Sequence, residues 1–426
     1  MKHKNIAYIN MTALKDNYNA IEHLLSENGS STDGKKPRII AVVKADAYGH
    51  GIQNVASALG DAGCDMYAVS SEEEAVELRE IEEKNGRLPD ILILSRISPE
   101  NVSDMIEKNI TTAVTSYDNA LALNDAALEA GGRLKIHVKL DTGMNRVGFY
   151  AREEDTCDTA DKIEELSKCS GLELCGIFTH FSSADDEMMD GKTVDGYEDC
   201  GGYTKMQLSR FTHMIDELKK RGVNPGMVHA ANSAAILTMP EAYFDAVRAG
   251  IILYGLMPNG KCDDRFTPVM CFVSTVTHIH DIKAGEKVSY GAVFTASRDM
   301  KLATVSAGYA DGFERAYSGC KIVIRGKSYR QVGRICMDQF MVDITDGDGI
   351  EVGDRAVLFG GDSGESTNAL ARLAGTINYE VVCKISKRVN RIPVNVQKSA
   401  DADDSEDNAV DSVDSVNSGA EADSTD

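Results

Sequence analysis

Eight short apolar runs recur between residues 39 and 249, and most of them are separated by a stretch with helical character. The clearest helical stretch begins at Ser71, where Ser71 and Glu74 are expected to form a capping box. Strands that alternate with helices in this number predict a TIM barrel of the (β/α)8 type, with an open doubly wound sheet as the alternative. The runs are Ile39–Val43, Met66–Val69, Ile91–Leu94, Thr111–Thr115, Leu134–Leu140, Leu174–Thr179, Met227–Ala230 and Asp245–Ala249.

Beyond Gly255 the pattern changes to short β-type runs broken by turns, which predicts a second, mostly-β domain. One helix, about 367–373, interrupts the runs, and the amino-terminal segment Ile6–Ile9 could join their sheet. We expect a barrel over residues 12–255, a β domain from 1–11 and 256–393, and an acidic tail over 394–426. The expected strands are Phe272–His280, Val288–Phe294, Leu302–Val305, Lys321–Ile324, Gln331–Cys336, Phe340–Ile344 and Arg355–Phe359.

The formal net charge of −22 is unevenly distributed. Residues 399–426 hold ten Asp or Glu and no Lys or Arg, and residues 182–202 hold seven acids against Lys192 alone. We expect the tail to be disordered. We expect the 182–202 segment to loop outward, with a lid that follows His180 as the alternative. Because this excess of negative charge repels nucleic acid and anionic membranes, we expect neither nucleic acid nor a membrane surface as partner.

Ten cysteines are scattered without CxxC pairs, so we expect reduced, mostly buried thiols and no metal site. The first twenty residues contain Lys15 and Asp16 and lack the apolar region of a signal peptide. No apolar stretch is long enough to span a bilayer. The expected location is therefore cytoplasmic.

Lys44 closes the first apolar run and is followed by the glycines of a loop. The carboxyl ends of barrel strands are where ligands bind. Partial burial lowers the pKa of an ammonium group, and a neutral amine is a nucleophile. Lys44 is therefore a candidate for a Schiff base, although a strand-end lysine whose ammonium group reaches back to water is the equally simple alternative.

The seventh and eighth runs end in features that suit a phosphate group. Ser233 places a hydroxyl at an expected helix start, although a plain N-cap serves there equally well. Gly250 allows close approach of backbone amides, and Arg248 adds a permanent positive charge. A strand-end lysine opposite a phosphate niche is what pyridoxal phosphate requires, with an aldehyde for the amine and a phosphate for the niche.

The chain resembles the alanine racemase family. Members of this family are pyridoxal-phosphate enzymes with an amino-terminal TIM barrel and a carboxy-terminal β domain. Eight motifs in the family's order support the resemblance over residues 5 to about 393. They are AVVKADAYGHG at 41–51, KLDTGMNRVG at 139–148, THF at 179–181, ANSAA at 231–235, VSYGA at 288–292, GYADG at 308–312, GRICMD at 333–338 and INYE at 377–380.

The resemblance implies a racemase that interconverts L-alanine and D-alanine by a two-base mechanism and supplies D-alanine for peptidoglycan. Racemisation needs a base on each face of the substrate Cα. Lys44 would hold the cofactor and act on one face, and Tyr290 would act on the other. Because the family takes this tyrosine from the second subunit, the resemblance also implies an obligatory homodimer.

Further roles are implied one position at a time. Arg248 would face the pyridine nitrogen, and His180 would lie behind both Arg248 and Tyr290. Arg146 would contact the cofactor and the substrate carboxylate, with Lys139, carbamylated in many family members, orienting it. Met337 and Tyr309 would come from the partner subunit, Met337 offering a backbone N–H to the carboxylate. The remaining cofactor-binding positions are Tyr48, Asn232, Ser233, Gly250, Ile251 and Tyr379.

Tyr379 and Met337 would leave a narrow space beside the Cα, which favours alanine over serine or bulkier amino acids. A serine or broader-specificity racemase, or a decarboxylase on the same fold, is the alternative enzyme. A non-catalytic pyridoxal-phosphate carrier would lack Tyr290 and the whole β domain. The chain departs from the family pattern only in the 182–202 segment and the tail.

Overall fold

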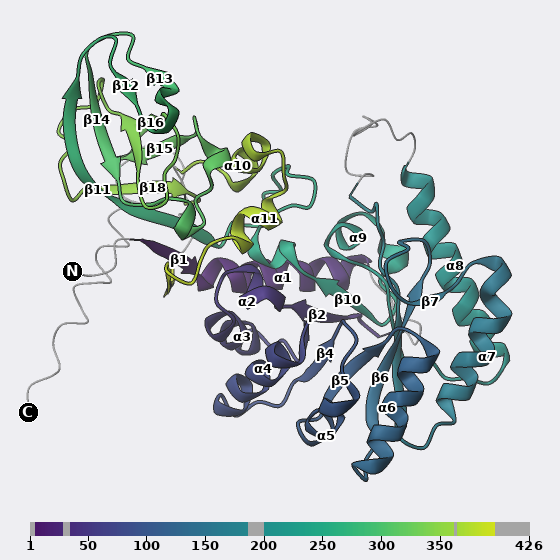
Figure 1. Cartoon of the computed structure of the whole chain (residues 1–426). Helices are drawn as coiled ribbons and strands as arrows, with labels where there is room; N and C mark the ends of the chain where they lie inside the picture. The colour runs from purple at the N-terminus through teal and green to yellow at the C-terminus, as the bar shows by residue number, and fades with distance from the viewer. Residues whose placement is uncertain (1–4, 29–34, 186–199, 362–363, 397–426) are drawn as a thin grey trace, which may run out of the picture.

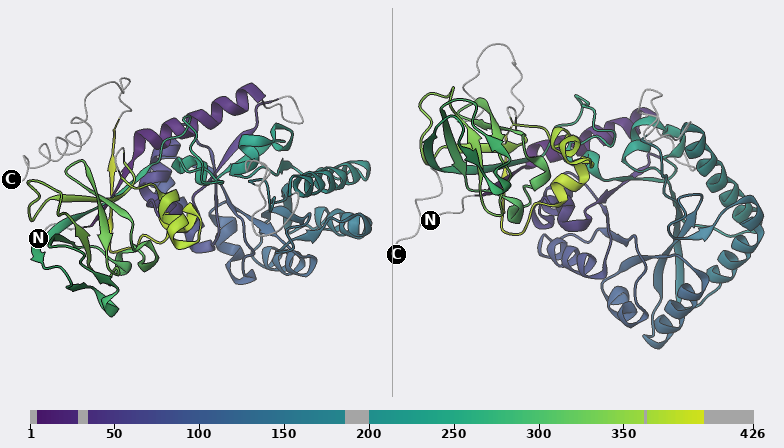
Figure 2. Two further views of the ribbon diagram at one scale, coloured as in Figure 1. Left: turned by 90° about the horizontal axis from the view of Figure 1, so that it is seen from above. Right: turned by 45° about the horizontal axis from the view of Figure 1, so that its top comes forward.

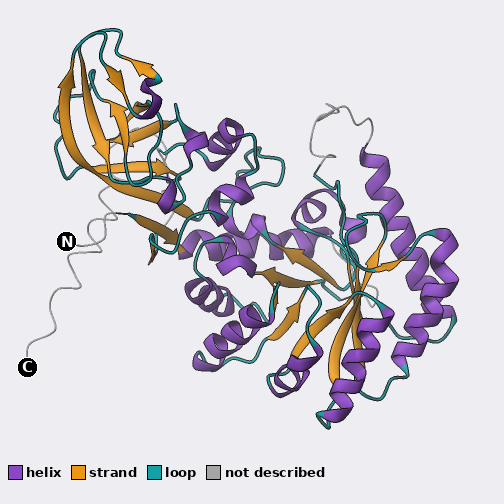
Figure 3. Ribbon diagram, in the orientation of Figure 1, coloured by secondary structure: helices purple, strands orange, loops and turns teal. Residues whose placement is uncertain are grey.

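The computed structural model describes residues 5–28, 35–185, 200–361 and 364–396, which form two units joined side by side (Figure 1). One unit is a closed ring of parallel strands surrounded by helices. The other consists mainly of antiparallel strands with two short helices at the side that faces the first unit (Figure 3). The predicted fold class, an α/β barrel followed by a mostly-β domain, is therefore confirmed.

The barrel strands pair in the order β5, β4, β3, β2, β10, β9, β8, β6, and the pairing of β5 with β6 closes the ring. Their residues are almost all buried, because one face of each strand fills the barrel and the other lies under the outer helices. Closure excludes the open doubly wound sheet. The strands are β2 (Arg38–Val42), β3 (Met66–Val69), β4 (Asp90–Ile93), β5 (Ile110–Val114), β6 (Leu134–Asp141), β8 (Leu172–Phe178), β9 (Met227–His229) and β10 (Ala246–Ala249).

The helices form a layer outside the strands, as Figure 2 shows from two directions. Ser71 caps α4, accepting a hydrogen bond from Glu74 N at 3.3 Å. The other half of the predicted capping box is wrong, because the Glu74 carboxylate binds the amides of Ser70 and Ala45 instead. The helices are α1 (Met11–Asn28), α3 (Ile52–Asp61), α4 (Glu72–Lys84), α5 (Val102–Glu107), α6 (Tyr117–Glu129), α7 (Thr156–Ser167), α8 (Cys200–Lys220) and α9 (Ser233–Thr238).

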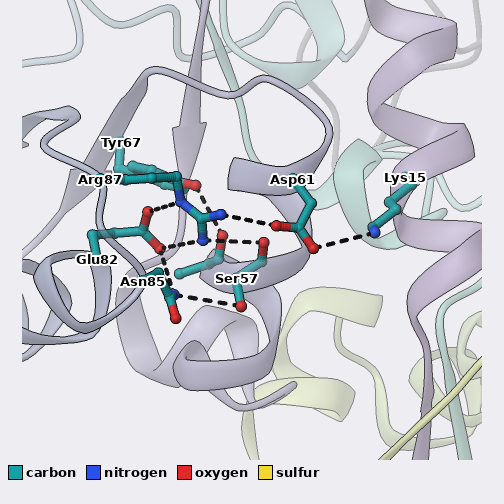
Figure 4. Close-up of polar contacts among 8 residues, drawn as sticks. Lys15, Ser57, Asp61, Tyr67, Glu82, Asn85 and Arg87 are labelled. Atoms are coloured by element: carbon teal, nitrogen blue, oxygen red, sulfur yellow. Dashed lines mark hydrogen bonds and ion pairs between the residues drawn. The ribbon is translucent and has the colours of Figure 1, made fainter.

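A charged cluster joins three of the outer helices near β3 (Figure 4). The side chain of Glu82 on α4 is fully buried and accepts from Arg87 Nε at 2.7 Å. Arg87 also reaches Asp61 on α3 at 2.8 Å, and Asp61 lies 3.5 Å from Lys15 on α1. A buried carboxylate is tolerated only when it is paired and hydrogen-bonded, so Arg87 is needed to hold α4 beside α3.

The second domain contains a sheet in the order β14, β17, β16, β15, β18, β11, β1, β19. The amino-terminal strand β1 (Ile6–Asn10) joins it as predicted, pairing antiparallel with β11 and parallel with β19. Its other strands are β11 (Met270–Ile282), β14 (Met300–Val305), β15 (Lys321–Ile324), β16 (Lys327–Val332), β17 (Phe340–Asp343), β18 (Arg355–Phe359) and β19 (Asn390–Val394). Strands β12 (Lys287–Val288) and β13 (Phe294–Thr295) pair with each other in a separate two-stranded sheet.

Several boundaries in this domain differ from the sequence prediction. The predicted strand Val288–Phe294 is wrong, because Ser289 and Ala292 have φ of 68° and 50° and the chain makes a 3-10 turn between β12 and β13. The predicted strand Gln331–Cys336 ends at Val332, since Gly333 has φ 72°. The helix predicted near 367 is α10 (Thr367–Ala374), but the prediction of a single helix missed α11 (Asn378–Cys383), and β19 was also missed.

Nine of the ten cysteines have described side chains, and all nine of these are free thiols. The expectation that they are mostly buried is wrong, since only Cys64 and Cys320 are buried. The predictions for the tail and for the 182–202 segment fall largely on residues 397–426 and 186–199, which lie outside the described residues. Among the described helices, none is both long and apolar enough to cross a membrane.

Candidate active site

Lys44 follows β2 directly and opens a short turn, α2 (Lys44–Tyr48), at the carboxyl end of the barrel. Four consecutive non-glycine residues of this turn, Ala45 to Tyr48, have φ between 53° and 54°. Such a left-handed conformation costs roughly 1–2 kcal/mol per residue. The turn therefore persists only because surrounding groups fix it.

Two side chains beside the turn supply part of that support. Glu74 Oε1 accepts from the amide of Ala45 at 2.6 Å. His50 Nδ1 lies 3.0 Å from the carbonyl oxygen of Tyr48 and 3.2 Å from that of Ala47, so this nitrogen carries the proton. Burial lowers the pKa of His50 to about 4, which keeps the ring neutral. The turn is thus held by a carboxylate on one side and a neutral imidazole on the other.

Lys44 lies among other cationic side chains. Burial, followed by the positive charge of Arg146, lowers the pKa of the Lys44 amine, and the Arg248 charge adds to this effect. The negative charge of Glu74 raises the pKa of Lys44 and so opposes this effect. A lowered pKa raises the fraction of neutral, nucleophilic amine, as the Schiff-base hypothesis requires.

Tyr48, Ser233 and Gly250 form a small polar cradle beside this turn. Ser233 Oγ accepts from Gly250 N at 3.0 Å. A Cβ atom at Gly250 would lie 2.8 Å from Tyr48 Oη and 3.5 Å from Ser233 Oγ, so glycine keeps the cradle open. Ile251 follows as the first residue of a 3-10 helix, whose leading N–H groups lack intrahelical partners.

The plain N-cap interpretation of Ser233 is wrong. Asn232 is the N-cap of α9, and its Oδ1 accepts from Ala235 N at 3.1 Å. The Ser233 hydroxyl is therefore free of capping and faces Gly250. Asn232 was predicted as a cofactor-binding residue, and the contacts described here give it a capping role.

Arg248 extends from β10 and is buried at the barrel mouth. Its Nη2 donates to the carbonyl oxygens of Thr179 at 2.7 Å and Ala230 at 2.8 Å. The same nitrogen lies 3.4 Å from His180 Nδ1, so the two side chains are in contact. Burial lowers the pKa of Arg248 to about 9, and burial together with the Arg248 charge lowers that of His180.

Two buried histidines that the sequence prediction missed continue from Arg248 into the barrel. Arg248 Nη1 lies 2.9 Å from His229 Nδ1, and His229 Nε2 lies 2.9 Å from His137 Nδ1. An arginine can only donate, so His229 Nδ1 accepts and its Nε2 donates to His137. Both lie on predicted barrel strands, His137 within β6 and His229 at the end of β9, so their positions on these strands could have pointed to them.

Lys139 lies near the end of β6 and is buried. Its Nζ donates to the carbonyl oxygen of Leu140 at 2.8 Å and lies 5.4 Å from the centre of the Phe178 ring. Burial, followed by the Arg248 charge, lowers the pKa of Lys139 to about 7. The negative charge of Asp141 opposes this lowering, and the Asp141 carboxylate itself is bonded to backbone amides.

The loop that bears Arg146 is shaped by that carboxylate. Asp141 accepts from the amides of Gly143 at 3.0 Å, Asn145 at 2.9 Å and Arg146 at 3.0 Å. Gln207 of α8, fully buried, donates to Thr142 Oγ1 in the same loop at 3.4 Å. The Arg146 side chain is exposed on a fixed backbone, close enough for its charge to lower the pKa of Lys44 and Lys139.

Tyr379 reaches the site from the second domain. It lies on α11, which the sequence prediction missed as a helix, and its ring centre is 6.1 Å from that of Tyr48. Burial raises the pKa of both phenols well above the ordinary value, so both remain protonated hydrogen-bond donors. The second domain thus closes one side of the cradle.

Tyr290, Met337 and Tyr309 lie elsewhere on the second domain. Their side chains are 69%, 52% and 44% exposed. Tyr290 and Met337 line a hollow of about 780 Å³ together with Ser289, Cys336 and Gln339. Lys44 lies instead at the barrel mouth of the same chain, so the predicted site residues form two groups. One group lies at the barrel mouth and includes Tyr379 of the second domain, and the other lies elsewhere on the second domain.

The fold and the site define a barrel with a partly buried lysine of lowered pKa beside a small polar cradle at the carboxyl ends of its strands. Comparison with known proteins specifies the class. The model of the alanine racemase N-terminal domain matches residues 9–258, and that of the C-terminal domain matches residues 269–393. The chain belongs to the alanine racemase family, and its function is that of an alanine racemase, an isomerase.

Individual relatives agree over most of the chain. Alanine racemase 1 of Clostridium acetobutylicum is 41% identical over 364 residues, covering 84% of this chain and 89% of the relative. The alanine racemase of Methanococcus maripaludis is 38% identical and covers 92% and 99%. The solved alanine racemase of Clostridium difficile 630 superposes with a TM-score of 0.80 at 38% identity, covering 93% of this chain and 97% of that one.

Proposed function

We propose that the chain interconverts L-alanine and D-alanine with pyridoxal 5'-phosphate as cofactor, in a homodimer whose subunits share each active site. The observation that carries this proposal is the Lys44 amine, with its lowered pKa, next to the cradle of Tyr48, Ser233 and Gly250. The amine suits an aldehyde and the cradle suits a phosphate.

The residues present fit this cofactor. The cradle that a Cβ at Gly250 would fill offers a phenol, a hydroxyl and backbone amides, which are donors for a phosphate. Lys44, Lys139, Arg146 and Arg248 surround His180 closely enough to lower its pKa, so the site is electropositive. Such a site suits an anionic cofactor and a substrate carboxylate. Tyr379 and Ile251 would complete the phosphate contacts.

When bound, pyridoxal phosphate supplies an aldehyde that takes up an amine and a conjugated ring that stabilises negative charge at the substrate Cα. Lys44 then moves a proton to or from one face of the Cα. Tyr290 of the partner subunit does the same on the opposite face, so that a proton leaves one side and returns on the other. The two bases together account for racemisation.

The other cations of the site orient the reactants. Arg146, on the loop fixed by Asp141, would hold the substrate carboxylate, with the Met337 amide of the partner subunit opposite. Arg248 would face the pyridine nitrogen, and because it is a donor only it leaves that nitrogen unprotonated. This limits charge delocalisation into the ring and favours racemisation over transamination.

Lys139 is a candidate for carbamylation. Carbamylation joins a neutral amine to CO2 and releases one proton, and the lowered pKa of Lys139, about 7, supplies the neutral amine near neutral pH. The resulting anion would lie between the Arg248 and Arg146 charges, both of which lower the pKa of Lys139. A carbamylated Lys139 would therefore orient Arg146.

A homodimer explains why Tyr290, Met337 and Tyr309 are exposed on one domain while Lys44 lies on the other. Large apolar side chains that are exposed together typically mark an interface. A second copy would bring the hollow beside Tyr290 against the barrel mouth. The nine described free thiols suit a reducing compartment, so we place the protein in the cytoplasm, where its D-alanine would serve peptidoglycan synthesis.

A chiral assay of the cofactor-loaded Tyr290→Phe variant tests the two-base proposal. The wild type is expected to convert either enantiomer of alanine to equal equilibrium amounts, and to act more weakly on serine. Tyr290→Phe removes one proton carrier, so solvent-deuterium exchange at the Cα of L-alanine should fall far more than that of D-alanine. Equal loss from both enantiomers would contradict the assignment of Tyr290 to a single face.

A further inference from the structure

The last carbonyl of the left-handed turn is bound by a side chain from the other domain. Arg391, on strand β19, donates from Nε to the carbonyl oxygen of Gly49 at 3.0 Å. Gly49 follows Tyr48 and has φ 77°, and a Cβ there would lie 2.3 Å from the carbonyl oxygen of Val382 on α11. The turn that bears Lys44 is thus pressed against the second domain at Gly49, where α2 and α11 meet in Figure 1.

The rest of the Arg391 guanidinium binds the segment between α11 and β19. Nη1 donates to the carbonyl oxygens of Ser386 at 2.5 Å and Val389 at 2.7 Å. Nη2 donates to that of Ile385 at 2.5 Å. The planar fork of an arginine can hold several acceptors at once, whereas a lysine is a single point donor. Arg391 therefore joins the backbone that follows Tyr379 to the backbone that follows Tyr48.

We propose that Arg391 is a positioning residue for the active site. It fixes the carboxyl end of the strained turn against the second domain, and it thereby holds Tyr48 and Lys44 in register with Tyr379. Glu74 fixes the start of the turn through Ala45 N, so Arg391 completes the support at its other end. The inference rests on the proposed roles of Lys44 and Tyr48, and it adds a residue far from them in sequence.

If Arg391 only joined the two domains, it would stabilise the whole chain and would not stabilise the turn at residues 45–51 more than other segments. The two roles are separated by hydrogen exchange of the holoenzyme, since a local opening releases only the amides of the segment that opens. Replacing Arg391 by Met keeps the length of the side chain and removes every donor. Arg391→Lys keeps the charge but not the fork. Arg330→Met, at an exposed position of β16 in the same domain, is the matched control.

In Arg391→Met, amides of residues 45–51 should exchange about tenfold faster or more, while those of β6 exchange as in the wild type. The apparent Kd for pyridoxal phosphate should rise about tenfold. At saturating cofactor kcat should fall about tenfold with KM for alanine within about twofold, because Arg391 makes no contact with substrate. Arg391→Lys should lie between, and Arg330→Met should match the wild type in all three measurements.

Uniformly faster exchange along the chain, or wild-type exchange at 45–51, would overturn the proposal. So would failure of both Arg391 variants to fold, since it would make the residue a general requirement of the fold. Lys44→Ala tests the proposed function separately. If Lys44→Ala loses the covalently bound cofactor while Arg391→Met matches the wild type in exchange, cofactor Kd and kcat, the positioning role alone is refuted. Persistence of covalent cofactor in Lys44→Ala would refute the proposed function, whatever the exchange at 45–51 shows.

Discussion

Ser233 offers the sharpest test of the proposal that the cradle binds a phosphate, because its hydroxyl does not cap a helix. Its oxygen already accepts from Gly250 N at 3.0 Å, so its proton is free for a phosphate oxygen. Ser233→Ala removes both interactions and leaves the rest of the cradle unchanged. A hydrogen bond to a charged group contributes about 1.5–3 kcal/mol, and about 1.4 kcal/mol is a tenfold change in affinity. The expected rise in cofactor Kd is therefore about 10-fold to 150-fold.

The variant should be measured by titrating cofactor-free protein with pyridoxal phosphate and following the absorbance of the bound form. At saturating cofactor, kcat should stay within about threefold of the wild type, because Ser233 does not act on the Cα. The free energy of unfolding without cofactor should fall by about 1 kcal/mol, since Gly250 N loses its acceptor.

Ser116→Ala is the matched control. Ser116 caps α6, and its Oγ accepts from Asn119 N at 3.3 Å, so the variant also loses one acceptor for a backbone amide. It should lose about 1 kcal/mol of stability with no change in cofactor Kd. If Ser233→Ala lost only stability in the same way and bound the cofactor as the wild type does, the cradle would not be a phosphate site.

Two further predictions concern buried charges. Lys139 is neutral in the folded protein above about pH 7, whereas in the unfolded chain it stays charged up to about pH 10.5. Between these two pH values the unfolded chain binds more protons than the folded protein, so the free energy of unfolding rises with pH. Lys139→Met should flatten this rise in denaturant titrations without bicarbonate, and an unchanged slope would contradict the lowered pKa. Arg87→Met strands the fully buried Glu82 and should cost about 3–5 kcal/mol of unfolding free energy, whereas a loss below about 1 kcal/mol would contradict the account of Figure 4.

Much of the fold could be predicted from apolar periodicity. Strands buried on both faces appear as continuous apolar runs, and all eight barrel strands were located this way to within a residue or two. The errors fall where the backbone conformation, rather than the apolar pattern, determines the secondary structure. Positive φ at Ser289 and Ala292 turns a strand-like run into a 3-10 helix, and α11 is a single short turn with too few residues to show a helical period.

The site was predictable in its residue types but less so in its geometry. The strand-end position of Lys44 pointed to a partly buried amine, and the Gly250 motif pointed to an open cradle. The left-handed turn after Lys44 has no signal in Ala45 or Asp46, since neither position is glycine. Two of its supports, Glu74 and Arg391, are distant in sequence, and only the folded chain brings them to the turn.

The central claim is that the Lys44 amine holds the cofactor. Borohydride reduction of the cofactor-loaded protein, followed by peptide mapping, tests it directly. We expect one pyridoxyl group per chain, on Lys44, and none in Lys44→Arg. A pyridoxyl group on another lysine such as Lys139, or none at all, would contradict it.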